Sequence, residues 1–218
     1  MSKTIGLLHP GQMGITLAAS LQNSGHQVLW CSSGRSEKTI ERATSEQLQA
    51  VSSLEALCQR VEVLFCVCPP HAALDVLHQA IDAGYRGTYV DANAISPRRT
   101  RELARVAQAH GLHYVDGGIV GGPARQRGTT WLYLSGEGAE EVAALVKAGP
   151  MEVQVLDEGI GAASGMKMCF ASYTKGTTAL LSAILATSEQ LGVREVLMEQ
   201  WRRYGWELPE EAERRATK

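Results

Sequence analysis

Near its start the chain reads Thr4-Ile5-Gly6-Leu7-Leu8-His9-Pro10-Gly11-Gln12-Met13-Gly14. This segment is typical of a short apolar strand, a glycine loop and the start of a helix. Glycine at position 11 lets a ligand approach the backbone, and glycine at position 14 lets the helix pack closely on the strand. The free N–H groups at the start of such a helix favour an anion such as a pyrophosphate. We therefore expect a dinucleotide to contact His9, Pro10, Gly11, Gln12, Met13 and Gly14. His9 replaces the first glycine of the usual G-x-G-x-x-G fingerprint, so a generic strand–loop–helix turn is the alternative.

Apolar runs alternate with helical stretches up to residue 161. After the first strand, further strands are expected at 27–31, 61–67, 88–91, 113–115, 130–134 and 152–156. Helices are expected at 14–23, from Ser52 with Glu55 in a capping box, and at 71–83, 97–110 and 139–147. Almost continuously apolar strands between helices predict a doubly wound, Rossmann-type parallel sheet, an α/β fold that binds ligands beyond the carboxyl ends of its strands.

The pattern changes after residue 161. One long helix is expected over 164–191, followed by a shorter helix over 194–204 and a charged tail over 207–218. We therefore expect an NAD(P)-binding domain over residues 1–161 and a C-terminal helical segment over 162–218. The long helix has few charged residues that would mark a solvent-exposed face. This predicts that another copy of the chain covers the helix in a homodimer.

The composition excludes several classes of protein. Hydrophobic residues make up 44% of the 218 residues and charged residues 20%, which excludes wholesale disorder. Lys and Arg number 21 against 23 Asp and Glu, so no basic excess is available to bind nucleic acid. No apolar run approaches the ~20 residues of a membrane span, and the N-terminus lacks a signal-peptide pattern. The five cysteines have no framework spacing, which favours a cytoplasmic protein; Cys66 and Cys68 are interpreted as small buried residues, and no metal site is predicted.

The end of the second expected strand bears on the choice of cofactor. The chain there reads Trp30-Cys31-Ser32-Ser33-Gly34-Arg35-Ser36, without the Asp or Glu that usually binds the ribose hydroxyls of NAD. Arg35 can pair with a 2′-phosphate, and Ser32 and Ser36 can donate hydrogen bonds to it. This segment therefore favours NADP, with NAD still possible. The alternative is that Arg35 is a solvated loop residue and Ser36 caps the next helix.

Three further segments follow the glycine loop in order. They read Val90-Asp91-Ala92-Asn93-Ala94-Ile95-Ser96-Pro97, Tyr114-Val115-Asp116-Gly117-Gly118-Ile119-Val120-Gly121-Gly122, and Gly161-Ala162-Ala163-Ser164-Gly165-Met166-Lys167. With the glycine loop, they resemble motifs of the β-hydroxyacid dehydrogenases, the family of the 3-hydroxyisobutyrate and 6-phosphogluconate dehydrogenases. The resemblance covers roughly residues 4 to 190 and is nearest to a subgroup whose C-terminal domain has no assigned function.

The resemblance implies roles for several residues. Lys167 is expected to be the general acid–base beside the nicotinamide, because a lysine next to an apolar ring can exchange a proton near working pH. Ala171 stands where the family usually has a substrate-binding Asn, and Thr174 or Lys175 can supply that polar contact from the next turn. Val120 replaces the family's serine, whereas Gly121 and Gly122 remain and offer backbone N–H groups to a carboxylate.

Other residues are assigned to the cofactor side of the same site. Cys68, Pro69 and Pro70 are expected to lie under the cofactor ribose, although the prolines can simply end the strand. Asn93 is expected to touch the nicotinamide or the substrate, or else to form an Asx turn. Arg125 and Arg127 can attract an anionic substrate or remain at the surface.

These expectations predict an NADP-dependent oxidoreductase that interconverts a small hydroxy acid and its carbonyl form, with Lys167 exchanging the proton. An imine reductase-like enzyme and a non-catalytic NADP-binding module or sensor are the alternatives. Full members of the family carry an all-helical second domain, so the short segment after Lys167 is expected to be a truncated form of it.

Overall fold

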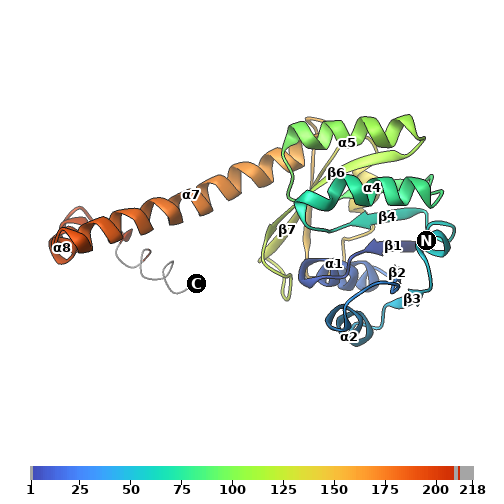
Figure 1. Ribbon diagram of the computed structural model, residues 1–218, viewed down its shortest axis with the longest axis horizontal. Coiled ribbons are helices and arrows are strands. Elements are labelled where there is room, and N and C mark those ends of the chain that lie inside the picture. Colours follow the sequence, from blue (N-terminus) through green and yellow to red (C-terminus); the bar gives the residue numbers. More distant parts are fainter. Residues whose placement is uncertain (1, 209–210, 212–218) are drawn as a thin grey trace. The chain divides into compact units, whose positions relative to one another are not determined.

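The computed structural model describes residues 2–208 and 211, and the chain divides into two units, Met1–Met168 and Cys169–Lys218. In the described part of the first unit, an eight-stranded sheet has the order β3-β2-β1-β4-β5-β6-β7-β8 (Figure 1). Its strands are β1 (Thr4–Leu8), β2 (Gln27–Cys31), β3 (Gln49–Val51), β4 (Val63–Cys66), β5 (Thr88–Asp91), β6 (His113–Gly121), β7 (Thr130–Ser135) and β8 (Glu152–Leu156). The chain crosses over after β3, which is the doubly wound arrangement expected from the sequence.

The last two strands of the sheet run opposite to the others, because β8 is parallel to β7. The pairs on either side of β1, β4 and β5 are parallel, whereas β7 runs antiparallel to β6, with Gly121 opposite Thr130. The strand β6 therefore extends to Gly121, well beyond the expected 113–115. The glycines in 117–121 suggest a loop in the sequence, but the pairing with β7 supplies the hydrogen bonds that keep them in a strand.

The helices of the first unit connect these strands. They are α1 (Gln12–Asn23), α2 (Glu37–Ser45), α3 (Leu54–Cys58), α4 (Ala73–Asp82) preceded by a 3-10 turn (Pro70–Ala72), α5 (Pro97–Ala109) and α6 (Ala139–Ala143). The expected cap of α5 is confirmed, since the Ser96 hydroxyl accepts a hydrogen bond from Arg99 N at 3.3 Å. The expected cap of α3 is wrong by one residue: Ser53, not Ser52, accepts from Ala56 N at 3.1 Å.

Two apolar cores cover the two faces of the sheet. Leu7 belongs to the core beside α1 and α6, whereas its neighbour Leu8 belongs to the core beside α3, α4 and α5. The same alternation places Trp30 in the first core and Leu29 in the second. Successive side chains of a strand point to opposite faces, so this double coverage explains why the strands are apolar almost throughout.

The second unit is helical where it is described. Helix α7 (Ala162–Gln190) begins in the first unit and ends in the second, and α8 (Arg194–Arg203) follows it. These bounds lie close to the expected 164–191 and 194–204, whereas most of the expected tail over 207–218 lies outside the described residues. The core of this unit consists of Leu181, Leu185, Met198 and Trp201. Among the described residues, no helix is long and apolar enough to cross a membrane.

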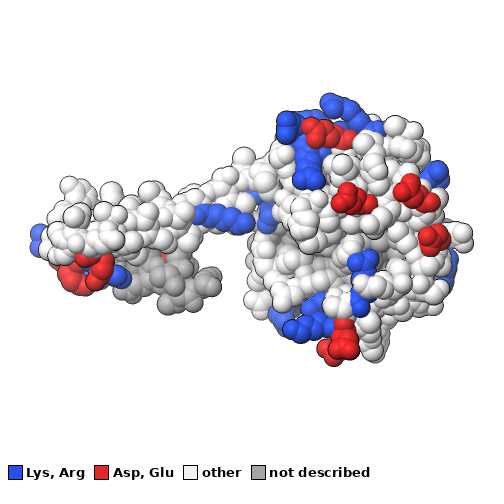
Figure 2. All heavy atoms as spheres, viewed as in Figure 1, with Lys and Arg blue, Asp and Glu red and all other residues white. Residues whose placement is uncertain are grey.

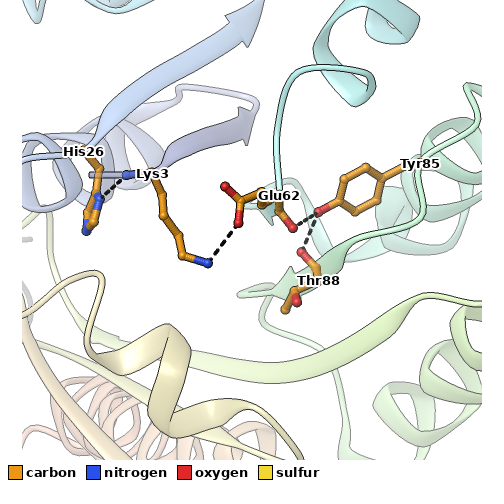
Figure 3. A network of polar contacts seen from close by, with 5 residues as sticks. All are labelled: Lys3, His26, Glu62, Tyr85 and Thr88. Atoms are coloured by element: carbon orange, nitrogen blue, oxygen red, sulfur yellow. Dashed lines mark hydrogen bonds and ion pairs between the residues drawn. The ribbon is translucent and has the colours of Figure 1, made fainter. Parts of the chain in front are cut away.

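A polar network holds the amino ends of the central strands (Figure 3). Lys3, just before β1, forms a 3.0 Å ion pair with Glu62, just before β4. The Tyr85 hydroxyl lies 2.9 Å from the carbonyl oxygens of both Glu62 and Thr88, which connects the starts of β4 and β5. His26 Nδ1 accepts a 3.1 Å hydrogen bond from Lys3 N. The amino edge of the sheet is therefore fixed by contacts within the protein.

Candidate functional site

The glycine loop leaves the carboxyl end of β1 with an unusual backbone conformation. His9 has a φ of 67°, in the left-handed region that a residue other than glycine seldom adopts. Its carbonyl oxygen accepts a 2.7 Å hydrogen bond from Gly11 N, which closes the turn. His9 therefore replaces the first glycine of the fingerprint at the position of the loop that has a left-handed backbone. The buried His9 Nδ1 has no hydrogen-bond partner in the part of the chain that is described.

The two glycines of the loop differ in their surroundings. A Cβ at Gly14 would lie 2.6 Å from the His9 carbonyl oxygen, so close packing of α1 on the loop requires glycine there. A Cβ at Gly11 would meet nothing nearer than 3.9 Å, so the folded chain itself does not require glycine at that position. Gly11 is also the N-cap of α1, and no described side chain caps this helix end. The N–H groups at the start of α1 are therefore available to an anion.

The loop after β2 places a cation at the same edge of the sheet. Arg35 is partly buried, and its Nε has no hydrogen-bond partner among residues 2–208 and 211. Ser36 occupies the N-cap position of α2, but its hydroxyl lies 3.1 Å from Thr39 Oγ1 and does not cap the helix. Ser32 Oγ is 3.4 Å from the carbonyl oxygen of Val51. A guanidinium nitrogen without a partner among the described residues, in a loop that also carries Ser32 and Ser36, suits a 2′-phosphate.

Polar side chains join the ends of β4 and β5. The Asn93 side chain is buried, accepts a 2.6 Å hydrogen bond from Cys68 N and donates a 3.4 Å bond to Cys66 Sγ. Asp91 accepts from Asn93 N at 3.0 Å and from the Tyr114 hydroxyl at 2.8 Å. Burial raises the pKa of Asp91 to about 6. These bonds fix the loop that continues into the exposed Pro69 and Pro70, so the buried Asn93 side chain holds this loop in position.

A buried carboxylate anchors the start of α7 on β6. Asp116 Oδ2 accepts hydrogen bonds from Gly161 N, Ser164 N and Ser135 Oγ, each at 3.0 Å. Its Oδ1 accepts a 2.6 Å bond from Ser164 Oγ, which also lies 2.7 Å from Thr100 Oγ1. A carboxylate at a helix N-terminus neutralises the dipole as well as the free N–H groups. The first turn of α7 is therefore held against β6 within the first unit.

This anchor brings Lys167 against β6. A Cβ at Gly118 would lie 3.2 Å from the Cβ of Lys167 and would clash with the Ala163 carbonyl, so glycine permits the approach of α7. Lys167 is partly buried there, one turn beyond the anchored Ala163 and Ser164. The cofactor-side loops and Lys167 thus belong to the same unit of the chain.

The remaining residues assigned to the substrate fall into two groups. Gly121 (φ 118°) and Gly122 are exposed at the end of β6, whereas Val120 is buried. Ala171, Thr174 and Lys175 belong to the second unit, and their part in a substrate site stays a prediction.

The loop over residues 122–129, between β6 and β7, is tied down at its ends and exposed at its tip. Thr130 Oγ1 donates a 2.7 Å hydrogen bond to the Gly122 carbonyl, and Ala124 N donates a 3.2 Å bond to Thr16 Oγ1 of α1. Arg127 forms two 3.0 Å hydrogen bonds with Glu152, so the carboxylate neutralises the charge of this arginine. Arg125 instead lines a groove of about 610 Å³ together with Gln12, Thr16 and Arg42. Of the two arginines, Arg125 is therefore the one placed to meet an anion.

The sequence pattern did not single out two residues of this edge. Arg42 donates a 3.2 Å hydrogen bond from Nη1 to the Pro10 carbonyl and so ties α2 to the glycine loop. Asp116 stands within one of the motifs, but its hydrogen-bond partners come together only in the fold. On the face of the first unit drawn in Figure 2, Lys and Arg are interspersed with Asp and Glu, which agrees with the balanced composition.

Comparison with proteins of known sequence gives relatives of about a quarter identity. An uncharacterized 28.5 kDa protein of Methanothermus fervidus is 27% identical over 89% of this chain and 74% of its own length. A 3-hydroxyisobutyrate dehydrogenase of Pseudomonas aeruginosa is 28% identical over 62% of this chain. An NADPH-dependent reductive aminase of Aspergillus oryzae is 27% identical over 56% of this chain. The match spans 47% of the dehydrogenase and 41% of the aminase, less than half of each enzyme.

Solved structures share the fold over most of the chain. A conserved protein of unknown function, described as similar to 3-hydroxyacid dehydrogenases, is 32% identical with a TM-score of 0.77, over 97% of this chain and 80% of its own. A 3-hydroxyisobutyrate dehydrogenase of Mycobacterium tuberculosis, solved with L-serine, has a TM-score of 0.72 at 19% identity, over 92% of this chain and 70% of its own. Residues 4–168 match the family described as the NAD binding domain of 6-phosphogluconate dehydrogenase. The expected resemblance and the NAD(P)-binding Rossmann fold are thereby confirmed, and the chain belongs to this family of NAD(P)-binding, hydroxyacid dehydrogenase-like proteins.

Proposed function

We propose that the protein is an NADP-dependent oxidoreductase that interconverts a small hydroxy acid and its carbonyl form. One observation carries this proposal: Lys167 packs against Gly118 of β6, on a helix whose start is anchored by Asp116, in the same unit as the glycine loop. A cation fixed in that way can exchange a proton with a substrate oxygen at a defined position.

Features of the carboxyl edge support binding of NADP in particular. The space beside Gly11 and the uncapped start of α1 suit the pyrophosphate. The partly buried Arg35, with an unpartnered Nε, suits the 2′-phosphate, and the end of β2 has no carboxylate that would repel it. Once bound, the nicotinamide would supply or accept the hydride.

The residues of this chain would then have separate tasks. Lys167 would give a proton to the carbonyl oxygen during reduction and remove it from the hydroxyl during oxidation. The backbone N–H groups of Gly121 and Gly122 would bind the substrate carboxylate. Asn93 would hold the Cys68-Pro69-Pro70 loop under the cofactor ribose, through its 2.6 Å bond from Cys68 N. Thr174 and Lys175 would add the polar contact that Ala171 lacks.

A second copy of the chain is proposed as the partner of the second unit. Large apolar side chains are exposed along α7 and α8, among them Phe170, Tyr173, Leu180 and Val196. Burial of such a surface would stabilise a homodimer, as the sequence also predicts. A cytoplasmic location remains the expectation from the cysteine spacing.

The similarity to a reductive aminase favours a second candidate reaction, the reduction of an imine. Retention of Lys167 favours the hydroxy acid, because protonation of an alkoxide needs such an acid and reduction of an iminium ion does not. Parallel assays with a panel of 2- and 3-oxo acids, and of ketones with added amine, separate the two. A protein that binds NADPH but oxidises it with neither panel would be the non-catalytic module.

The decisive test compares Lys167→Ala with Lys147→Ala, a matched change at an exposed lysine of the first unit. We expect Lys167→Ala to lower kcat by about 100- to 10,000-fold and to leave the NADPH dissociation constant within about twofold. Lys147→Ala should change neither quantity. Unaltered turnover in Lys167→Ala would remove the lysine from the reaction, and equal loss of NADPH affinity would assign it to binding.

A further inference from the structure

Two thiols meet at the carboxyl end of β4. Cys66 is the last residue of the strand and is fully buried, whereas Cys68 follows two residues later and is partly exposed. Their Sγ atoms are 3.7 Å apart, with the Cys66 thiol donating towards Cys68. Cys68 lies just beyond the strand, and both side chains pack on the same apolar core. The pair therefore combines a partly exposed thiol, Cys68, with a buried thiol, Cys66.

The surroundings make the two sulfur atoms chemically unequal. The hydrogen bond from Cys66 lowers the pKa of the Cys68 thiol, so Cys68 is the better thiolate. The same hydrogen bond and burial hold the pKa of the Cys66 thiol well above its ordinary value. Asn93 donates to Cys66 Sγ at 3.4 Å and accepts from Cys68 N at 2.6 Å, which keeps the two residues in register.

We propose that Cys66 and Cys68 form a peroxide-sensitive dithiol, in which Cys68 is oxidised first and Cys66 then closes a disulfide. The Cys68 thiolate attacks hydrogen peroxide, the O–O bond breaks, and Cys68 becomes a sulfenic acid as hydroxide leaves. Cys66 sulfur then attacks the sulfenic sulfur and loses its proton, so that an S–S bond forms and water leaves. Overall, two thiols are oxidised and one peroxide is reduced to two water molecules.

The consequence for the cofactor rests on the proposed function. A disulfide requires an S–S distance of about 2.05 Å, so Cys68 must move towards Cys66. Such a movement would disturb the bond between Cys68 N and Asn93 and would shift the loop that continues into Pro69 and Pro70. Oxidation would therefore weaken binding of the dinucleotide, and a bound dinucleotide would cover Cys68 and slow its oxidation.

The experiment uses the full chain with Cys169→Ser, because Cys169 is the exposed cysteine outside the pair. The reduced protein is titrated with hydrogen peroxide; free thiols are blocked, disulfides are reduced, and the released thiols are labelled and located by mass spectrometry. We expect the intact mass to fall by two hydrogen atoms, the second label to appear on Cys66 and Cys68, and the NADPH dissociation constant to rise at least tenfold until dithiothreitol restores it. Prior addition of NADPH should slow the reaction severalfold.

Three variants keep the interpretation specific. Cys66→Ala should stop the reaction at a Cys68 sulfenic acid that dimedone traps, and Cys68→Ser should leave Cys66 unreactive. Cys58→Ala is the matched control, since burial raises the pKa of Cys58 to about 11, and the bridge should form as in the parent. Oxidation of Cys68 to a sulfinic acid without a bridge would overturn the proposal, as would a bridge that leaves NADPH affinity unchanged. A reduced protein that does not bind NADPH would contradict the proposed function alone, because the mass measurement is independent of the cofactor.

Discussion

The two edges of the same sheet differ in how completely the described residues satisfy the polar groups of the chain. At the amino edge, Lys3, Glu62 and Tyr85 satisfy one another and the neighbouring backbone (Figure 3). At the carboxyl edge, His9 has a left-handed backbone, and polar atoms of His9 and Arg35 are buried without a partner among the described residues. Buried polar groups are rarely left unpaired without a functional reason. The contacts of the amino edge therefore stabilise the sheet, whereas the carboxyl edge keeps polar atoms available to a bound molecule.

The largest effect is expected where the carboxyl edge is satisfied from within. Asp116→Ala leaves Gly161 N, Ser164 N and two hydroxyls without their acceptor, so it should lower the free energy of unfolding by about 4 kcal/mol. Because α7 loses its anchor, kcat should fall as well. Urea denaturation measures the first quantity, and Asp116→Asn offers a milder variant if the alanine variant does not fold. The control Asp82→Ala, at an exposed site on α4, should change the free energy of unfolding by less than about 0.5 kcal/mol. A similar change in the two variants would show that Asp116 does not anchor α7.

The buried acid Asp91 should make stability depend on pH. Its pKa of about 6 lies above the ordinary 3.8, so the folded protein keeps a proton that the unfolded chain has lost. The free energy of unfolding contributed by Asp91 therefore falls as the pH rises from about 4 to about 6, and it stays low above that range. Asp91→Asn removes this titration, so the stability of the variant relative to the parent should rise by up to about 3 kcal/mol between pH ~4 and pH ~7. A relative stability that is flat across this range would show that Asp91 is ionised at its ordinary pKa.

Removal of the Arg35 side chain should affect the cofactor more than the fold. Arg35→Ala should raise the dissociation constant of NADPH by about 10- to 100-fold, because a charge-assisted contact to the 2′-phosphate is lost. The NADH dissociation constant should stay within about threefold. Fluorescence titration measures both, and Arg86→Ala at the opposite edge is the matched control. Equal weakening of NADH binding and NADPH binding would show that Arg35 does not contact the 2′-phosphate.

The two loop glycines should separate stability from binding. Gly14→Ala should lower the free energy of unfolding by about 2 kcal/mol, because the added Cβ meets the His9 carbonyl. Gly11→Ala should cost less than about 1 kcal/mol, since its Cβ has room, yet it should weaken NADPH about tenfold by occupying the space for the pyrophosphate. Thermal denaturation and NADPH titration of the pair test this contrast. Normal NADPH affinity in Gly11→Ala would place the pyrophosphate elsewhere.

The smallest effect is expected at the amino edge. Tyr85→Phe removes a hydroxyl that lies 2.9 Å from two carbonyl oxygens, so stability should fall by about 1 kcal/mol. NADPH affinity and turnover should not change. A loss of NADPH affinity in this variant would contradict the separation of the two edges, because it would show that they are coupled.

Local signals in the sequence were sufficient for most of the fold. The alternation of apolar strands with helices predicts the sheet, and Ser96-Pro97 marks the start of α5. The helix α2 and the strand β3 were missed, because α2 buries only Ala43 and β3 is three residues long. The direction of β7 was not predictable, since it depends on pairing between residues that are brought together only by the fold.

For a similar reason, the sequence predicts some residues of the candidate site and not others. The glycine loop and Lys167 stand in recognisable motifs, so the sequence places them. The role of Asp116 depends on Ser164, 48 residues away, and the approach of Lys167 depends on the missing side chain of Gly118. Such contacts leave no periodic pattern, because each joins two segments at one point.

The loop over residues 122–129 has a consequence for how the sequence can diverge. Its ends are tied to β7 and α1 through Thr130 and Thr16, while the exposed Arg125 and Gln126 lie between these ties. Residues at the tip can therefore be exchanged without disturbing the apolar cores on either face of the sheet. A lineage that keeps the two ties can therefore change the tip by single steps, each of which leaves the sheet and its two cores intact.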